Sequence, residues 1–101
     1  MPSISAVNTF RLRPGVTVEQ FARFSAELDR PTCLRLGPVE SFDVYLAEAG
    51  STVDVVEVMT VASWPEWEQV RDSAPEMAPV VARFEELVDV GSVTTYLTRK
   101  A

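Results

Sequence analysis

A carboxylate stands in the middle of an apolar segment. Residues 55–61 read VVEVMTV, so Glu57 is flanked on both sides by residues typical of a strand buried on both faces. Burying a lone carboxylate costs several kcal/mol unless it is paired or takes up a proton. A carboxyl group in such a place has a raised pKa, which suits acid-base chemistry near neutral pH. Glu57 is therefore the first candidate for a catalytic group.

Asn8 interrupts a second apolar row in the same way. In residues 3–12, SISAVNTFRL, alternate residues are apolar except Asn8. If the two segments are neighbouring strands, Asn8 and Glu57 line one cavity between a sheet and its helices, unless a bulge in either strand separates them. The alternative is that Glu57 forms an ion pair with Arg11 or Arg35, or lies at the exposed rim of a dimer.

Several other side chains are candidates for contacts with a ligand. The hydroxyl of Tyr45 is placed with Glu57 and Asn8 as a third catalytic group, although tyrosines on strands usually pack and reach solvent. Trp64 and Trp67 are expected either in the core or stacked on a ligand, and Cys33 is expected to be an ordinary thiol. The predicted substrate contacts are Asp29, Thr32, Met59, Trp64, Trp67, Phe84 and Tyr96.

The composition excludes several kinds of site. The 101 residues include no histidine and one cysteine, so neither a Ser-His-Asp triad, a Cys-His pair nor an intrachain disulfide can form, and no zinc site is expected. The net charge of −6 argues against a nucleic-acid partner and an anionic membrane surface. The N-terminus does not read as a signal peptide, no stretch is apolar enough for a membrane span, and a single cysteine favours a cytoplasmic location.

The length and the pattern predict one domain, residues 1–101, of the α+β class. Strands are expected at residues 3–12, 39–49, 53–62 and 92–100. A first helix should begin at Val18, after the capping box of Thr17 and Gln20, and end before Pro31, followed by a loop over 31–38. A second helix, broken in two, should start after Ser63 and again at Pro75, and end at Gly91.

The order β-α-β-β-α-β predicts a ferredoxin-like fold. Its four-stranded antiparallel sheet has the strand order 4-1-3-2 and helices on one face. Both faces of the sheet carry apolar residues, with Val56 and Val58 on one and Val55 and Met59 on the other; Val39 is assigned to the face of Tyr45, opposite Phe42. Since the helices cover only one face, a second copy is expected to cover the other as a homodimer.

Four segments carry a resemblance to a known family: PGVTVEQFARF, ELDRPTCLRLGPVESFDVY, VVEVMTV and SAPEMAPVVARFEELV. In this order the chain resembles the RedY/HapK-like branch of the dimeric α/β-barrel superfamily. The positions that match its motifs are Asp29, Pro31, Thr32 and Glu57. The resemblance implies a homodimer without metal or organic cofactor, related to proteins of bacterial secondary metabolism associated with prodigiosin-type pathways.

The superfamily implies several activities for such a chain. Its members include polyketide cyclases, cofactor-free oxygenases and haem binders; the absence of histidine counts against haem. The oxygenases use an Asn, Trp and Arg constellation, for which Asn8, Trp64 and Arg71 supply the residue types. We expect a cofactor-independent cyclase or condensation-assisting enzyme that acts on a hydrophobic biosynthetic intermediate. The alternatives are a cofactor-free monooxygenase and a non-catalytic protein that shields an unstable intermediate.

Overall fold

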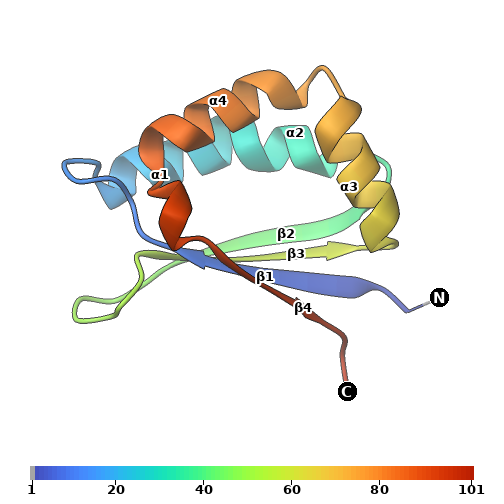
Figure 1. Cartoon of the computed structure of the whole chain (residues 1–101), viewed down its shortest axis with the longest axis horizontal. Coiled ribbons are helices and arrows are strands. Elements are labelled where there is room, and N and C mark those ends of the chain that lie inside the picture. The colour runs from blue at the N-terminus through green and yellow to red at the C-terminus, as the bar shows by residue number, and fades with distance from the viewer. Residues whose placement is uncertain (1) are drawn as a thin grey trace.

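The computed structural model describes residues 2–101 and forms a four-stranded antiparallel sheet with all long helices on one face (Figure 1). The sheet order is β2-β3-β1-β4, which confirms the predicted order and the ferredoxin-like fold. The strands are β1 (Ile4–Phe10), β2 (Val39–Leu46), β3 (Val55–Val61) and β4 (Thr94–Thr98). The two central strands, β1 and β3, therefore lie directly beneath the helical layer.

The first helical segment begins where the capping box predicts. In α1 (Val18–Phe24), the backbone N–H of Gln20 donates to Oγ1 of Thr17 at 3.1 Å, and the N–H of Thr17 donates to Oε1 of Gln20 at 2.8 Å. The predicted end before Pro31 is wrong. The chain continues through a π-helical turn, η1 (Ser25–Asp29), directly into α2 (Arg30–Leu34).

The π-helical turn explains how the helix passes a proline. Proline lacks an N–H, and its ring crowds the carbonyl four residues earlier, so it normally ends or kinks an α-helix. Here Pro31 is the second residue after the wider turn, at whose end the N–H of Arg30 donates to the carbonyl of Ser25, five residues back. Single π-helical turns inside α-helices are frequent at functional sites.

The second strand contains a bulge that changes which side chains face the helices. Val39 pairs with Val61 but Ser41 pairs with Thr60, so Glu40 is an extra residue in β2. As a result Val39 is buried on the same face as Phe42. The expectation that Val39 lies on the opposite face is wrong for this reason.

The predicted break in the second helix is confirmed. Ser63 accepts a hydrogen bond from the N–H of Glu66 at 3.4 Å and caps α3 (Trp64–Ser73). The chain is extended at Ala74, and α4 (Met77–Leu87) follows. A short 3-10 turn, η2 (Val90–Ser92), leads into β4. The break sets α3 at a steep angle to α4 in Figure 1.

Aromatic rings join the sheet to the helices. Phe10 of β1 is fully buried and meets Phe21 of α1 and Phe84 of α4 edge to face, with ring centroids 5.4 and 5.3 Å apart. Phe24 extends the cluster through Phe21 at 5.6 Å. Edge-to-face aromatic pairs add about 0.5–1.5 kcal/mol each beyond the area they bury. This cluster fixes the helical layer over β1.

No helix within residues 2–101 covers the opposite face of the sheet (Figure 1). Tyr45 and Tyr96 point to this face and are 58% and 56% exposed, while Val56 and Val58 between them are half-buried. The predicted second apolar face is therefore present. Across residues 2–101, every helix is too short or too polar to cross a bilayer.

Candidate functional site

Glu57 and Asn8 lie directly opposite each other at the centre of the sheet. The antiparallel register of β1 and β3 pairs Asn8 with Glu57, with Ala6 and Met59 as the next pair on the same face. The bulge of this sheet lies in β2, so it does not disturb the pairing. The expected adjacency is confirmed, and both side chains face the helical layer.

A pocket of about 380 Å³ lies between this part of the sheet and the helices. Its volume is at the small end of the range of about 300–1,000 Å³ found for ligand sites. Its walls are mostly apolar and come from all four strands, from α3 and α4, and from the η1, α2 and η2 segments. The predicted site residues that line it are Asn8, Asp29, Glu57, Met59, Trp64, Trp67 and Phe84.

Three predicted site residues do not line the pocket. Tyr45 pairs with Val56 across β2 and β3, and Tyr96 pairs with Val7 across β1 and β4, so strand alternation directs both rings to the uncovered face. A ligand in the pocket is out of reach of both hydroxyl groups of the same chain. Thr32 is buried in α2 but is not part of the pocket wall.

Glu57 is buried without a charged partner. It is 4% exposed, and its Oε2 is the only buried side-chain oxygen or nitrogen in residues 2–101 that lacks a hydrogen-bond partner. Burial raises the pKa of Glu57 to about 8, the negative charge of Asp29 raises it further, and hydrogen bonding with Asn8 acts in the opposite direction. Glu57 is therefore mostly protonated at neutral pH.

The alternative of an arginine partner for Glu57 is not what the structure shows. Arg11 lies at the surface and pairs with Asp89, with 3.6 Å between Nη2 and Oδ2. Arg35 is exposed at the end of α2. Within residues 2–101, Glu57 makes no ion pair.

Asp29 brings a second buried carboxyl group to the pocket. It lies at the end of η1 and is 6% exposed, and burial raises its pKa to about 6, against the lowering effects of Cys33 and the positive charge of Arg30. The thiol of Cys33 donates to Oδ1 of Asp29 at 3.4 Å. Burial raises the pKa of Cys33, and so do the charge and the hydrogen bond of Asp29 and, once ionised, Glu57, so this residue is a protonated donor and not a nucleophile.

Thr95 fixes the orientation of the Asn8 amide. Its hydroxyl donates to Oδ1 of Asn8 at 2.6 Å, which leaves the amide nitrogen of Asn8 free to face Glu57. Thr95 also lines the pocket. Sequence reasoning did not identify Thr95, although the alternation of β4 opposite Asn8 carries the signal.

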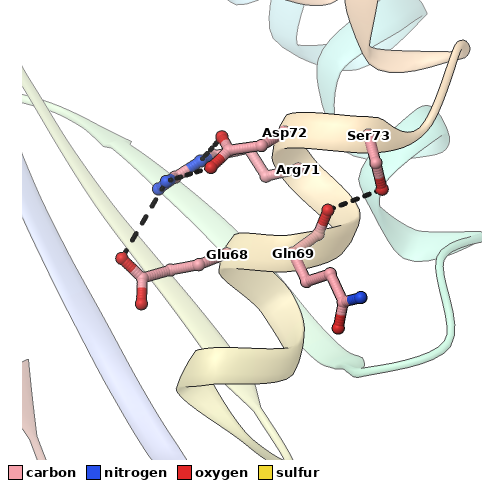
Figure 2. A network of polar contacts seen from close by, with 5 residues as sticks. All are labelled: Glu68, Gln69, Arg71, Asp72 and Ser73. Carbon is pink, nitrogen blue, oxygen red and sulfur yellow. Dashed lines mark hydrogen bonds and ion pairs between the residues drawn. The ribbon is translucent and has the colours of Figure 1, made fainter.

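Arg71 on α3 brings a cation to the pocket wall, where its charge is already compensated. Figure 2 shows its guanidinium between two carboxylates of the same helix. Nε of Arg71 lies 3.0 Å from Oδ1 of Asp72, and Nη2 lies 4.0 Å from Oε2 of Glu68. The hydroxyl of Ser73 donates to the carbonyl of Gln69 at 2.6 Å and closes the last turn of α3. Arg71 is 37% exposed, so it lies where the pocket meets solvent.

The comparisons with known proteins agree with the fold. A family model described as REDY-like protein HapK matches residues 4–100. HapK from Hahella chejuensis is 20% identical with a TM-score of 0.82, covering 97% of this chain and 92% of that chain. SnoaB, a cofactor-independent oxygenase from Streptomyces nogalater, is 13% identical with a TM-score of 0.77, covering 100% and 95%.

A further structural relative is a dimeric protein of unknown function and ferredoxin-like fold from Bacteroides fragilis NCTC 9343. It is 14% identical, with a TM-score of 0.70, and the match covers 97% of this chain and 96% of that chain. No curated protein sequence matches the chain. Identities this low establish a shared fold only. The family model covers all four strands and all the helices of the chain.

Proposed function

Because the chain belongs to the family described as REDY-like protein HapK, we propose that it is a cofactor-independent cyclase or condensation-assisting enzyme. Its substrate is a small hydrophobic intermediate of bacterial secondary metabolism. The observation that carries this proposal is the Glu57 carboxyl group, buried at the wall of an apolar pocket with an unpartnered oxygen. A buried polar atom without a partner destabilises a fold unless a ligand uses it.

The geometry supports acid-base chemistry on a bound carbonyl compound. Glu57, protonated at neutral pH, can donate its proton to a carbonyl oxygen, and the amide of Asn8 next to it can hydrogen-bond the same oxygen. Apolar residues such as Met59, Trp67 and Phe84 exclude water and hold the reacting atoms close together. No group of three or more potential metal ligands occurs in the described part of the chain.

The test is turnover by Glu57→Gln, with Glu48→Gln as the matched control. The variant keeps the size of the side chain but has no acidic proton to transfer, so product formation should fall by about 10²–10⁴-fold. Glu48 is exposed in the connection between β2 and β3, and its variant should retain wild-type turnover. Unchanged turnover in folded Glu57→Gln would remove Glu57 from catalysis. Saturable ligand binding without product in the wild type would indicate the shielding protein instead.

A cofactor-free monooxygenase is the second candidate, because Asn8, Trp64 and Arg71 all line the pocket. These are the residue types that the resemblance to the oxygenases of the superfamily implies, and SnoaB shares the fold. Oxygen uptake with an anthrone-like phenolic substrate separates the two reactions, since a cyclase consumes no oxygen. Uptake that is lost in Asn8→Ala and retained in Glu57→Gln would favour the oxygenase.

We also propose that the uncovered face of the sheet forms the interface of a homodimer. The side chains of Tyr45, Val56, Val58 and Tyr96 lie on this face, and two of the structural relatives are described as dimeric. Burial of these residues against a second copy would remove from water a surface that the helices leave open. The molar mass in solution, measured by light scattering, tests this proposal.

A further inference from the structure

We propose that Asp29 and Glu57 act together on an enolisable carbonyl ligand, with Asp29 as the base and Glu57 as the acid. This inference rests on the proposed function of the pocket and names its substrate class and reaction type. Two carboxyl groups, from η1 and from β3, line the same cavity, and each is more than nine-tenths buried. Asp29 accepts a hydrogen bond from the thiol of Cys33, whereas Oε2 of Glu57 has no hydrogen-bond partner.

The surroundings give the two carboxyl groups opposite protonation states at neutral pH. Burial raises the pKa of Asp29 to about 6, while the Cys33 thiol and the charge of Arg30 act in the opposite direction, so Asp29 is mostly ionised at pH 7. Glu57 has a pKa of about 8 and is mostly protonated, in part because the charge of Asp29 disfavours a second carboxylate. Carboxyl groups whose environments separate their pKa values take the roles of acid and base.

The other charged groups around the pocket leave this division intact. On α3, the guanidinium of Arg71 is engaged by Asp72 and Glu68 (Figure 2). On α4, Glu85 lines the outer part of the pocket and is exposed. The parts of β1, β2 and β4 that line the pocket carry no titratable side chain.

The reaction that this pair supports is keto-enol conversion. The carboxylate of Asp29 takes a proton from the carbon next to the carbonyl, and the electron pair of the broken C–H bond forms the carbon–carbon double bond. The carbonyl electron pair takes up the proton of Glu57, which completes the enol. Return of a proton from Asp29 to Glu57 restores both groups, so no oxidant or cofactor is needed. The enol carbon is then a nucleophile for the ring closure or condensation proposed above.

The first test is titration of the ligand-free protein, followed through the ¹³C shifts of the Asp and Glu carboxyl carbons. In Asp29→Asn the midpoint of Glu57 should fall by about one pH unit or more, because the neighbouring negative charge is gone. In Glu57→Gln the midpoint of Asp29 should stay near its wild-type value, since Asp29 loses its proton while Glu57 is still neutral. Glu48→Gln, in the exposed connection between β2 and β3, should move neither midpoint.

This asymmetry makes the titration decisive even where one variant does not fold. An unmoved Glu57 midpoint in Asp29→Asn would overturn the pair, and so would a drop of the Asp29 midpoint by one unit in Glu57→Gln, which would mean that Asp29 holds the proton. Because no substrate is present, this outcome is independent of turnover. The turnover test can therefore contradict the proposed function while the titration supports the acid-base pair. Equally, the titration can contradict the pair while the turnover test supports the proposed function.

The second test is hydrogen–deuterium exchange at the benzylic carbon of 1-phenylpropan-2-one in D₂O, followed by ¹H NMR. Trp64 and Trp67 are the only tryptophans and both line the pocket, so quenching of their fluorescence reports whether the ketone is bound. Wild type and Glu48→Gln should exchange well above buffer, and Asp29→Asn and Glu57→Gln should each fall to near the buffer rate. A bound ketone without exchange would overturn the enolisation step, and no binding up to the solubility limit would overturn the ligand class.

Discussion

Replacing Glu57 by glutamine should change how the stability of the protein depends on pH. The carboxyl group has a pKa of about 8 in the folded protein, compared with an ordinary value of 4.5. Below pH 4.5 both the folded and the unfolded chain keep the proton. Between pH 4.5 and about 8 the unfolded chain loses the proton while the folded protein keeps it. The free energy of unfolding of wild type therefore decreases as the pH rises through this window.

The size of the effect follows from the separation of the two pKa values. One pH unit corresponds to about 1.36 kcal/mol, so a window from 4.5 to about 8 amounts to a loss on the order of 3–5 kcal/mol. Glutamine has no such proton. Glu57→Gln should be within about 1 kcal/mol of wild type near pH 5 and more stable than wild type by roughly 3 kcal/mol or more near pH 8. Asp29 is present in both proteins and affects both curves alike.

Urea denaturation followed by circular dichroism, at pH 5, 6, 7 and 8 and one protein concentration, measures this difference. A fixed concentration matters because a dimer gains stability with concentration. Glu48→Gln is the control and should follow wild type at every pH. A difference between Glu57→Gln and wild type that does not change with pH would refute the raised pKa. A loss of about 3–5 kcal/mol at neutral pH would instead indicate a buried ion pair.

Three further predictions concern the cap, the thiol and the uncovered face. Thr17→Ala removes the oxygen that accepts from the Gln20 N–H and should lower the free energy of unfolding by about 0.5–2 kcal/mol in urea; an unchanged value would mean that the cap adds nothing. Cys33→Ala removes the donor to Asp29, whose pKa should rise above about 6 in a carboxyl ¹³C titration, and a fall would contradict the assigned hydrogen bond. Val58→Glu places a charge on the uncovered face and should shift the molar mass in analytical ultracentrifugation toward the monomer, whereas an intact dimer would place the interface elsewhere.

The alternation of side chains along the two central strands made the pairing of Asn8 and Glu57 predictable from the sequence. Period two places Asn8 and Glu57 on one face, and the β-α-β-β-α-β order makes their strands neighbours. The same rule, applied to Tyr45 and Tyr96, directs their hydroxyl groups to the uncovered face, so the strand pattern could have separated them from the pocket residues.

Local backbone irregularities were not predictable in the same way. Pro31 reads as the end of a helix, because the π-helical turn that accommodates it has no sequence signature. Because the sequence predicts a loop over residues 31–38, it does not reveal the helical four-residue spacing of Asp29 and Cys33. This spacing allows the thiol of Cys33 to donate to the Asp29 carboxylate. The extra residue Glu40 likewise places Val39 on the face that the helices cover. No glycine at this position indicates a bulge in the sequence.

The alternation of β3 also assigns neighbouring residues of one seven-residue strand to two different surfaces of the protein. Val55, Glu57, Met59 and Val61 face the helices, while Val56, Val58 and Thr60 face away. A substitution at an odd-numbered position alters the pocket or the core beneath the helices, and one at an even-numbered position alters the partly buried residues of the uncovered face. The lining of the pocket and the composition of the uncovered face can therefore change independently during evolution, although both depend on the side chains of a single strand.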